Sequence, residues 1–228
     1  MNINKLLTKT NYRKGNGKQN KYIVIHYVGA TGGAEDNCRY FLSNYRGSSA
    51  HYFVGHKGEI WQCVEDRDIA WHCGANTYKH PYCRNTNSIG IEMCCRKNLS
   101  NGTWYFEEET VESTIELVKE LMKKYNIPAA NVIRHYDVTG KTCPEPYVRD
   151  TAAWNTFKAS LTSNAPASGY LVKVTASVLN VRKGAGTGYK ITTQIHKDEV
   201  YTIVQEYNGW GKLKSNAGWI SLAYTKRV

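Results

Sequence analysis

The chain has 228 residues, of which 41% are hydrophobic and 21% charged, with 17 tyrosines and 6 tryptophans. This composition is typical of an ordered globular protein and excludes a disordered or fibrous one. The net charge of +11 indicates a polyanionic partner, but no arginine-rich arm is present, so we expect no nucleic-acid binding. No run of about 18 apolar residues occurs, so we expect no membrane insertion.

The N-terminal residues 1–9 are basic but lack the apolar core of a secretory signal. We therefore expect the protein to be made in the cytoplasm without a signal peptide and to stay there until it is released. Seven irregularly spaced cysteines favour a reducing compartment over a disulfide framework. Most should be small buried side chains, although Cys73 and Cys83 could close a loop under oxidising conditions.

The first two thirds of the chain mix strand and helix patterns. Residues 22–27 and 88–93 are short apolar segments that predict central strands. Apolar residues recur at helical spacing between residues 107 and 125 and predict an amphipathic helix. A short buried strand over 131–135 and a polar turn follow. This order predicts an α/β domain over residues 1–161, with a mixed central sheet flanked by helices.

Residues 162–169 are small, polar or helix-breaking and predict a linker. Short alternating segments separated by glycine-rich turns then fill residues 170–228 and predict a small all-β barrel. From Ser168 onward nine lysines and arginines stand against three acids, a net charge of +6. The smaller domain therefore carries the denser positive charge.

Three residues have the chemistry of a catalytic zinc site: His26 on the first central strand, His135 at the end of a later strand, and Cys143. Two imidazoles and one thiolate leave a tetrahedral ion one open position for water. Each residue alone also has a structural explanation, since a histidine on a strand is more often a core or surface residue. The segment 137–144 predicts a tight turn that would bring Cys143 back toward His135.

Six short motifs follow one another in the first domain. They are IVIHY (23–27), SAHYFV (49–54), AWHCG (70–74), NSIGIEM (87–93), RHYD (134–137) and GKTCP (140–144). In their order and spacing they resemble the type-2 N-acetylmuramoyl-L-alanine amidases, which include phage endolysins, bacterial autolysins and animal peptidoglycan-recognition proteins, and the resemblance covers roughly residues 20–160. It implies an amidase fold and one Zn²⁺ ion held by His26, His135 and Cys143, where some relatives have an aspartate as third ligand.

Zinc-assisted hydrolysis also needs a proton acceptor and a cation for the oxyanion. Glu92 is the candidate acid–base group because strand alternation directs it away from the apolar face of its segment. Lys141 is the candidate cation, two residues before Cys143. The alternatives are a solvated strand glutamate and an ordinary surface lysine.

Three further residues match family positions that line or support the substrate groove. We consider His51, Trp71 and His72 candidate substrate contacts, although buried structural histidines would have the same sequence pattern. Some relatives have a tyrosine just before the second-motif histidine. This chain has Ala50 there, so a tyrosine role does not transfer.

The C-terminal segment resembles bacterial SH3-like cell-wall-binding domains in VLNVRKGAGTGY (178–189), GWGK (209–212) and GWI (218–220). This resemblance implies anionic cell-wall polymers as partners. Tyr189 or Trp210 could contact peptide or glycan, whereas Trp210 and Trp219 could equally fill the barrel core.

The two resemblances together predict an enzyme that hydrolyses the amide bond between N-acetylmuramic acid and L-alanine in peptidoglycan. Without a signal peptide, the layout indicates a phage endolysin that reaches the wall through a holin. A bacterial autolysin with the same activity is the nearest alternative. Two other classes are a cysteine peptidase of wall stem peptides, with Cys143 as nucleophile and His135 as base, and a non-catalytic peptidoglycan receptor.

Overall fold

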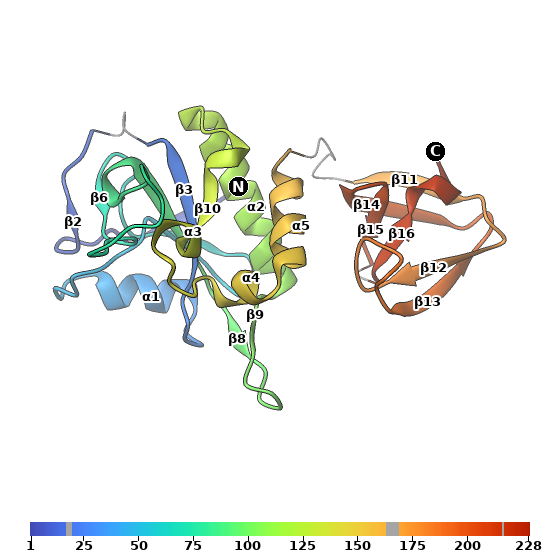
Figure 1. Ribbon diagram of the computed structural model, residues 1–228, viewed down its shortest axis with the longest axis horizontal. Helices are drawn as coiled ribbons and strands as arrows, with labels where there is room; N and C mark the ends of the chain where they lie inside the picture. The colour runs from blue at the N-terminus through green and yellow to red at the C-terminus, as the bar shows by residue number, and fades with distance from the viewer. Residues whose placement is uncertain (17–19, 163–168, 216) are drawn as a thin grey trace. The chain divides into compact units, whose positions relative to one another are not determined.

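The computed structural model describes residues 1–16, 20–162, 169–215 and 217–228. The chain forms two compact units, Met1–Leu161 and Thr162–Val228, drawn in Figure 1. The linker predicted over 162–169 falls almost entirely outside the described residues. Within the described ranges, no helix has both the length and the apolar character needed to cross a membrane.

A mixed six-stranded sheet forms the centre of the first unit. Its strand order is β1-β5-β4-β7-β3-β10, and every neighbouring pair is parallel except β4 and β5. The strands predicted at 22–27 and 88–93 are β3 and β7, two neighbouring parallel strands in the interior of the sheet. In sheet order the bounds are Ile3–Lys5, Ile60–Gln62, Tyr52–Val54, Ser88–Met93, Tyr22–Tyr27 and Val132–Arg134.

Helices cover both faces of this sheet. On one face, α2 (Glu108–Tyr125) and α5 (Thr151–Thr162) pack side chains such as Leu117 and Phe157 against the apolar side of the strands. Figure 1 shows where the two helices lie in the first unit. On the other face, α1 (Ala34–Phe41) packs near Phe53 of β4. The predicted sheet flanked by helices is therefore confirmed.

Smaller elements complete the first unit. Two short antiparallel pairs join β2 with β6 and β8 with β9. The bounds are β2 Tyr12–Arg13, β6 Ile69–Ala70, β8 Arg96–Lys97, β9 Trp104–Tyr105, α3 His135–Thr139, α4 Glu145–Arg149, η1 Asn85–Asn87 and η2 Ala129–Asn131.

Strand β7 divides its side chains between two environments. Ile89, Ile91 and Met93 lie in the apolar core beneath α2 and α5. Because side chains alternate along a strand, Ser88, Gly90 and Glu92 face the opposite side. That side carries the polar groups described below.

A buried carboxylate ties the sheet to the end of α2. Asp66 accepts hydrogen bonds from Tyr52, Gln62, Lys124 and Tyr125. Burial alone would raise the pKa of Asp66, but the bonds from Lys124, Tyr52 and Tyr125 outweigh it and hold the pKa below its usual value. The charged form is therefore stabilised in the folded chain.

We expect Asp66→Asn to lower the free energy of unfolding by about 1–3 kcal/mol, because the amide cannot accept the whole set of hydrogen bonds. Urea titration at pH 7 measures the change. The depressed pKa makes this contribution complete above the unfolded value of 3.8, and it is lost as pH falls through the lower folded value. Glu65→Gln removes only an exposed pair with Lys5 and is the matched control; an equal loss there would contradict the assignment.

The second unit is all-β, as predicted. Its seven strands form one antiparallel sheet in the order β13-β12-β16-β15-β14-β11-β17, and apolar residues from six of them share one core. The unpredicted additions are β17 (Thr225–Arg227) and a 3₁₀ turn, η3 (Leu222–Tyr224). The other strands are β11 Tyr170–Val174, β12 Val178–Arg182, β13 Ile191–His196, β14 Val200–Tyr207, β15 Trp210–Leu213 and β16 Trp219–Ser221.

Candidate active site

Strand register places three candidate residues in a row. In the parallel pair β3 and β7, His26 lies directly beside Glu92. On the other side of β3, Arg134 of β10 pairs with Ile25, so His135, the next residue, is brought beside His26. The row lies at the carboxyl ends of three parallel strands, where α/β proteins commonly place their sites.

The segment after β10 is a short helix rather than the predicted polar turn. Helix α3 begins at His135 because the Asp137 carboxylate accepts the Arg134 backbone N–H at 2.9 Å and stabilises the first turn. It ends at Gly140, whose φ of 86° is in the left-handed region that favours glycine. The chain then turns back, and the Tyr136 N–H donates to the Cys143 carbonyl at 2.8 Å. Cys143 thus comes to lie beside the histidines.

The three predicted zinc ligands converge. Ligand atoms of His26, His135 and Cys143 all lie within 4.8 Å of one another, and all three residues are buried. The Cys143 Sγ is 3.7 Å from Nδ1 of His26. Nδ1 of His135 is buried without a hydrogen-bond partner among the described residues. An N, N, S donor set with an unpartnered imidazole nitrogen fits a tetrahedral zinc ion with one open position.

Burial keeps the two histidines in the neutral form that metal binding requires. It lowers the pKa of His26 well below its usual value, and the neighbouring His135 adds to the effect. Burial, assisted by Lys141, lowers the pKa of His135 to about 4. Both imidazoles are therefore neutral at pH 7, as ligation requires. Burial raises the pKa of the Cys143 thiol to about 12, so a thiolate here requires a compensating cation.

Glu92 and Lys141 flank this cluster. Oε1 of Glu92 is 3.9 Å from Nδ1 of His26, and Oε2 is buried with no partner in the described part of the chain. Burial raises the pKa of Glu92 to about 8, and the charge of Lys141 opposes the rise. A partly buried carboxylate with a free oxygen beside the cluster is placed for proton transfer.

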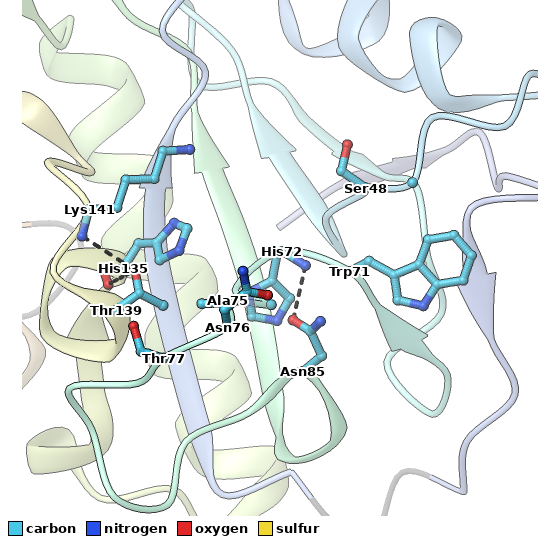
Figure 2. A pocket seen from close by; sticks show the side chains of 12 residues that line it. Ser48, Trp71, His72, Ala75, Asn76, Thr77, Asn85, His135, Thr139 and Lys141 are labelled. Carbon is cyan, nitrogen blue, oxygen red and sulfur yellow. Dashed lines mark hydrogen bonds between the residues drawn. The ribbon is translucent and has the colours of Figure 1, made fainter.

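Two adjoining cavities open over the cluster. One, of about 350 Å³, is lined by all five of these residues. The second, of about 700 Å³, shares Trp71, His72, His135 and Lys141 with it. Figure 2 shows the second cavity, with His135 and Lys141 on one side and Trp71 on the other. The predicted zinc ligands, Glu92, Lys141, Trp71 and His72 therefore line one groove formed by the two adjoining cavities.

The three candidate substrate contacts occupy different positions. Trp71 lines both cavities, and its ring meets the exposed Tyr45 edge-on at 5.9 Å. His72 also lines both cavities but is 9% exposed and bonds to His26. His51 is fully buried and lines neither: its Nδ1 accepts the Gly90 N–H, and its Nε2 donates to the Asp68 carbonyl. The structure therefore places His51 beneath the groove, where it supports Gly90 of β7.

Sequence reasoning gave no role to two residues around His72, namely Ser88 and the cavity-lining Asn85. Ser88 is buried and its hydroxyl contacts Nε2 of His72. Asn85 accepts the backbone N–H groups of His72 and Cys73 through Oδ1, one of the bonds drawn in Figure 2. The only sequence signal was that Ser88 shares a strand face with Glu92.

Comparison with known proteins agrees with this geometry. N-acetylmuramoyl-L-alanine amidase CwlL of Bacillus licheniformis is 34% identical over 182 residues, covering 73% of this chain and 47% of CwlL; the chain thus spans about half the length of this curated relative. The structure of PlyL (TM-score 0.60, 28% identity) covers 73% of this chain and 100% of its own. A mutant endolysin from Bacillus subtilis (TM-score 0.57, 30% identity) covers 71% and 99%.

The two units match two families. Residues 177–226 match the bacterial SH3 domain, in agreement with the all-β second unit. Residues 16–146 match the N-acetylmuramoyl-L-alanine amidase family, and this range holds both histidines, the cysteine, Glu92 and Lys141. The chain therefore belongs to the N-acetylmuramoyl-L-alanine amidase family and carries a bacterial SH3 domain after its amidase domain.

Proposed function

We propose that the protein is a zinc-dependent amidase that hydrolyses the bond between N-acetylmuramic acid and L-alanine in peptidoglycan. The observation that carries the proposal is the convergence of His26, His135 and Cys143 at the floor of a groove that also holds Glu92 and Lys141. Family membership supports the choice of bond.

The side chains have separate roles in this reaction. Zinc, when bound by the two histidines and the cysteine, supplies a Lewis acid and lowers the pKa of water. Glu92 accepts the proton of the attacking water and passes it to the leaving amine. The Lys141 ammonium group faces the same cavity and stabilises the oxyanion of the tetrahedral intermediate. A cation held by His26 would lower the pKa of Glu92, as Lys141 already does.

A cysteine peptidase is the less favoured reading of the same residues. A nucleophilic cysteine needs a lowered pKa, whereas burial raises the pKa of Cys143 to about 12. In the peptidase hypothesis His135 is the base, whereas the imidazole that contacts Cys143 Sγ is that of His26, through Nδ1 at 3.7 Å. A ligand set suits these contacts better than a nucleophile and base.

Metal analysis tests the proposal. We expect one zinc per purified chain, loss of peptidoglycan hydrolysis in a strong chelator, and recovery when zinc is restored. Zinc content is measured by atomic emission, and hydrolysis by the fall in turbidity of purified cell walls. A metal-free protein that is fully active and is inhibited by iodoacetamide would establish the peptidase instead.

The second unit is proposed to bind the cell wall. Its net charge of +6 attracts anionic wall polymers, and the exposed Tyr189 ring offers a surface for peptide or glycan. Trp219 is buried and belongs to the packing of the domain, while Trp210 is partly exposed.

Removing residues 168–228 should leave a folded, zinc-binding, active amidase domain with weaker wall binding. The reason is that Met1–Leu161 is a compact unit with its own core. Co-sedimentation with purified walls measures binding, and hydrolysis of soluble muropeptides measures the activity. A truncated chain that aggregates and loses zinc would contradict the two-domain organisation.

The biological setting is proposed to be host lysis by a phage endolysin that reaches the wall through a holin. A bacterial autolysin with the same chemistry is the alternative. Expression in Escherichia coli with and without a co-expressed holin separates them: an endolysin should cause lysis only when the holin is present.

A further inference from the structure

The two ring nitrogens of His26 face different partners. Nδ1 points toward the other predicted zinc ligands and Glu92, and lies 3.7 Å from Sγ of Cys143 and 3.9 Å from Oε1 of Glu92. Nε2 lies 3.0 Å from Nδ1 of His72. A neutral imidazole has one donor and one acceptor nitrogen. Only the tautomer with the proton on Nε2 leaves a lone pair on Nδ1 for zinc, so this contact decides whether His26 is ready to bind metal.

The contacts beyond His72 set the direction of this hydrogen bond. Nε2 of His72 lies 3.2 Å from the Ser88 hydroxyl, and that hydroxyl donates to the Arg84 backbone carbonyl at 2.7 Å. A carbonyl can only accept. The Ser88 hydrogen is therefore used, and its oxygen must accept from Nε2–H of His72. Nδ1 of His72 is then the acceptor, and His26 must donate its Nε2–H.

A competing arrangement would reverse this order, but its geometry is poorer. The Ser88 hydroxyl could instead donate to Sγ of Cys73, which is 3.9 Å away. Sulfur is a weak acceptor, and the Arg84 carbonyl is much nearer. If the Cys73 thiol instead donates to the Ser88 hydroxyl, the hydrogen bonds from His26 through His72 to Ser88 keep the same direction.

His72 is also held firmly in place. Its backbone N–H donates to Oδ1 of Asn85 at 3.1 Å. Its ring lies against the backbone of Gly90, where an added Cβ would be 2.5 Å from Cγ of His72. Glycine at this position of β7 therefore allows the ring to approach the strand and reach both His26 and Ser88.

We propose that His72 is a positioning residue that, oriented by Ser88 and the Arg84 carbonyl, fixes the tautomer of His26 so that Nδ1 is free to bind zinc. The inference rests on the proposed function for the identity of the metal. His72 lines the groove, where it would orient the metal-binding His26 rather than contact the substrate. Groups that orient metal-binding histidines commonly change metal affinity by about 10–100-fold when removed.

The tautomer is measurable without metal and without mutation. In the metal-free wild-type protein labelled with ¹⁵N in histidine, long-range ¹H–¹⁵N correlation spectra distinguish a protonated Nε2 from a protonated Nδ1. We expect His26 and His72 both to carry the proton on Nε2. A His26 ring protonated on Nδ1 would overturn the proposed direction of the hydrogen bonds from His26 through His72 to Ser88. This result is independent of whether zinc is the natural metal.

Two substitutions separate positioning from packing. His72→Leu removes the acceptor for Nε2–H of His26, and we expect the zinc dissociation constant to rise about 10–100-fold. His72→Gln keeps an acceptor oxygen on a flexible side chain and should recover most of that loss. Ser88→Ala, which removes the acceptor for Nε2–H of His72 and lies one residue further from the metal than His72, should weaken zinc binding less than His72→Leu.

Zinc affinity is measured by competition with a chromophoric chelator, and circular dichroism of the metal-free variants shows whether each is folded. Unchanged zinc affinity in folded His72→Leu would overturn the positioning role, as would equal losses in the Leu and Gln variants. Wild-type protein that binds no zinc would instead overturn the proposed function. The tautomer spectrum would still show whether His72 accepts the hydrogen bond from His26. If His72→Leu does not fold, the Ser88→Ala affinity and the wild-type spectrum decide the proposal.

Discussion

Cys143→Ala should purify without zinc and should lose peptidoglycan hydrolysis by about 10³-fold or more. The loss follows because two buried imidazoles alone do not complete the ligand set, and a catalytic metal contributes several kcal/mol to the transition state. Zinc content and the rate of wall hydrolysis are measured on the same preparation. His26→Ala should give the same pair of losses.

Cys95→Ala is the matched control, since it makes the same substitution at another fully buried cysteine. Cys95 contacts the Ala30 carbonyl at 3.7 Å and is outside the metal cluster. We expect one zinc per chain and a rate within a few-fold of wild type. Full zinc occupancy in folded Cys143→Ala would remove Cys143 from the ligand set, and loss of zinc in both variants would point to general destabilisation.

The parts of the fold that the sequence predicts are those with strong local periodicity. The segments 22–27 and 88–93 are apolar and become the central strands β3 and β7. The helix predicted between 107 and 125 differs from α2 by one residue at its start. Strand alternation also places Glu92 opposite the apolar face, as the core beneath α2 bears out. Local patterns are sufficient for these elements because burying a strand or one face of a helix requires apolar residues at the spacing of that element.

The local start of α3 was not predicted. The sequence 137–144 has the composition of a turn, and only the Asp137 carboxylate bonded to the Arg134 N–H reveals a helix beginning at His135. A cap of this kind involves two residues and produces no periodic pattern. Because α3 is one short turn, propensity alone does not identify it.

The contacts around the ligands depend on pairings far apart in the sequence. His26 and His72 are 46 residues apart, and the bond between them needs the loop before η1 to fold over β7. The separation of His51 from the groove has the same origin, because its ring bonds to Gly90 and Asp68. A single sequence shows that histidines are present, whereas their partners depend on the tertiary fold.

The charge state of Glu92 connects the metal to the proposed chemistry. In the folded chain burial raises its pKa to about 8, with Lys141 opposing the rise. Without a further cation, Glu92 would be protonated in most molecules at pH 7 and could not act as a base there. Zinc binding at His26 would favour the carboxylate. The acid–base group is therefore expected to become competent only when the metal site is filled.

Glu92→Gln should bind one zinc and remain folded, but its rate of hydrolysis should fall by about 10²–10⁴-fold. The amide preserves the size of the side chain and removes its ability to take the water proton. Rate and zinc content are measured together on purified peptidoglycan. Glu145→Gln is the control: it neutralises a nearby acid that contacts the Tyr27 hydroxyl at 3.3 Å, and its rate should stay within a few-fold of wild type. A Glu92→Gln protein with near wild-type activity would show that the proton is taken by another group, and Glu92 would then be only a strand residue.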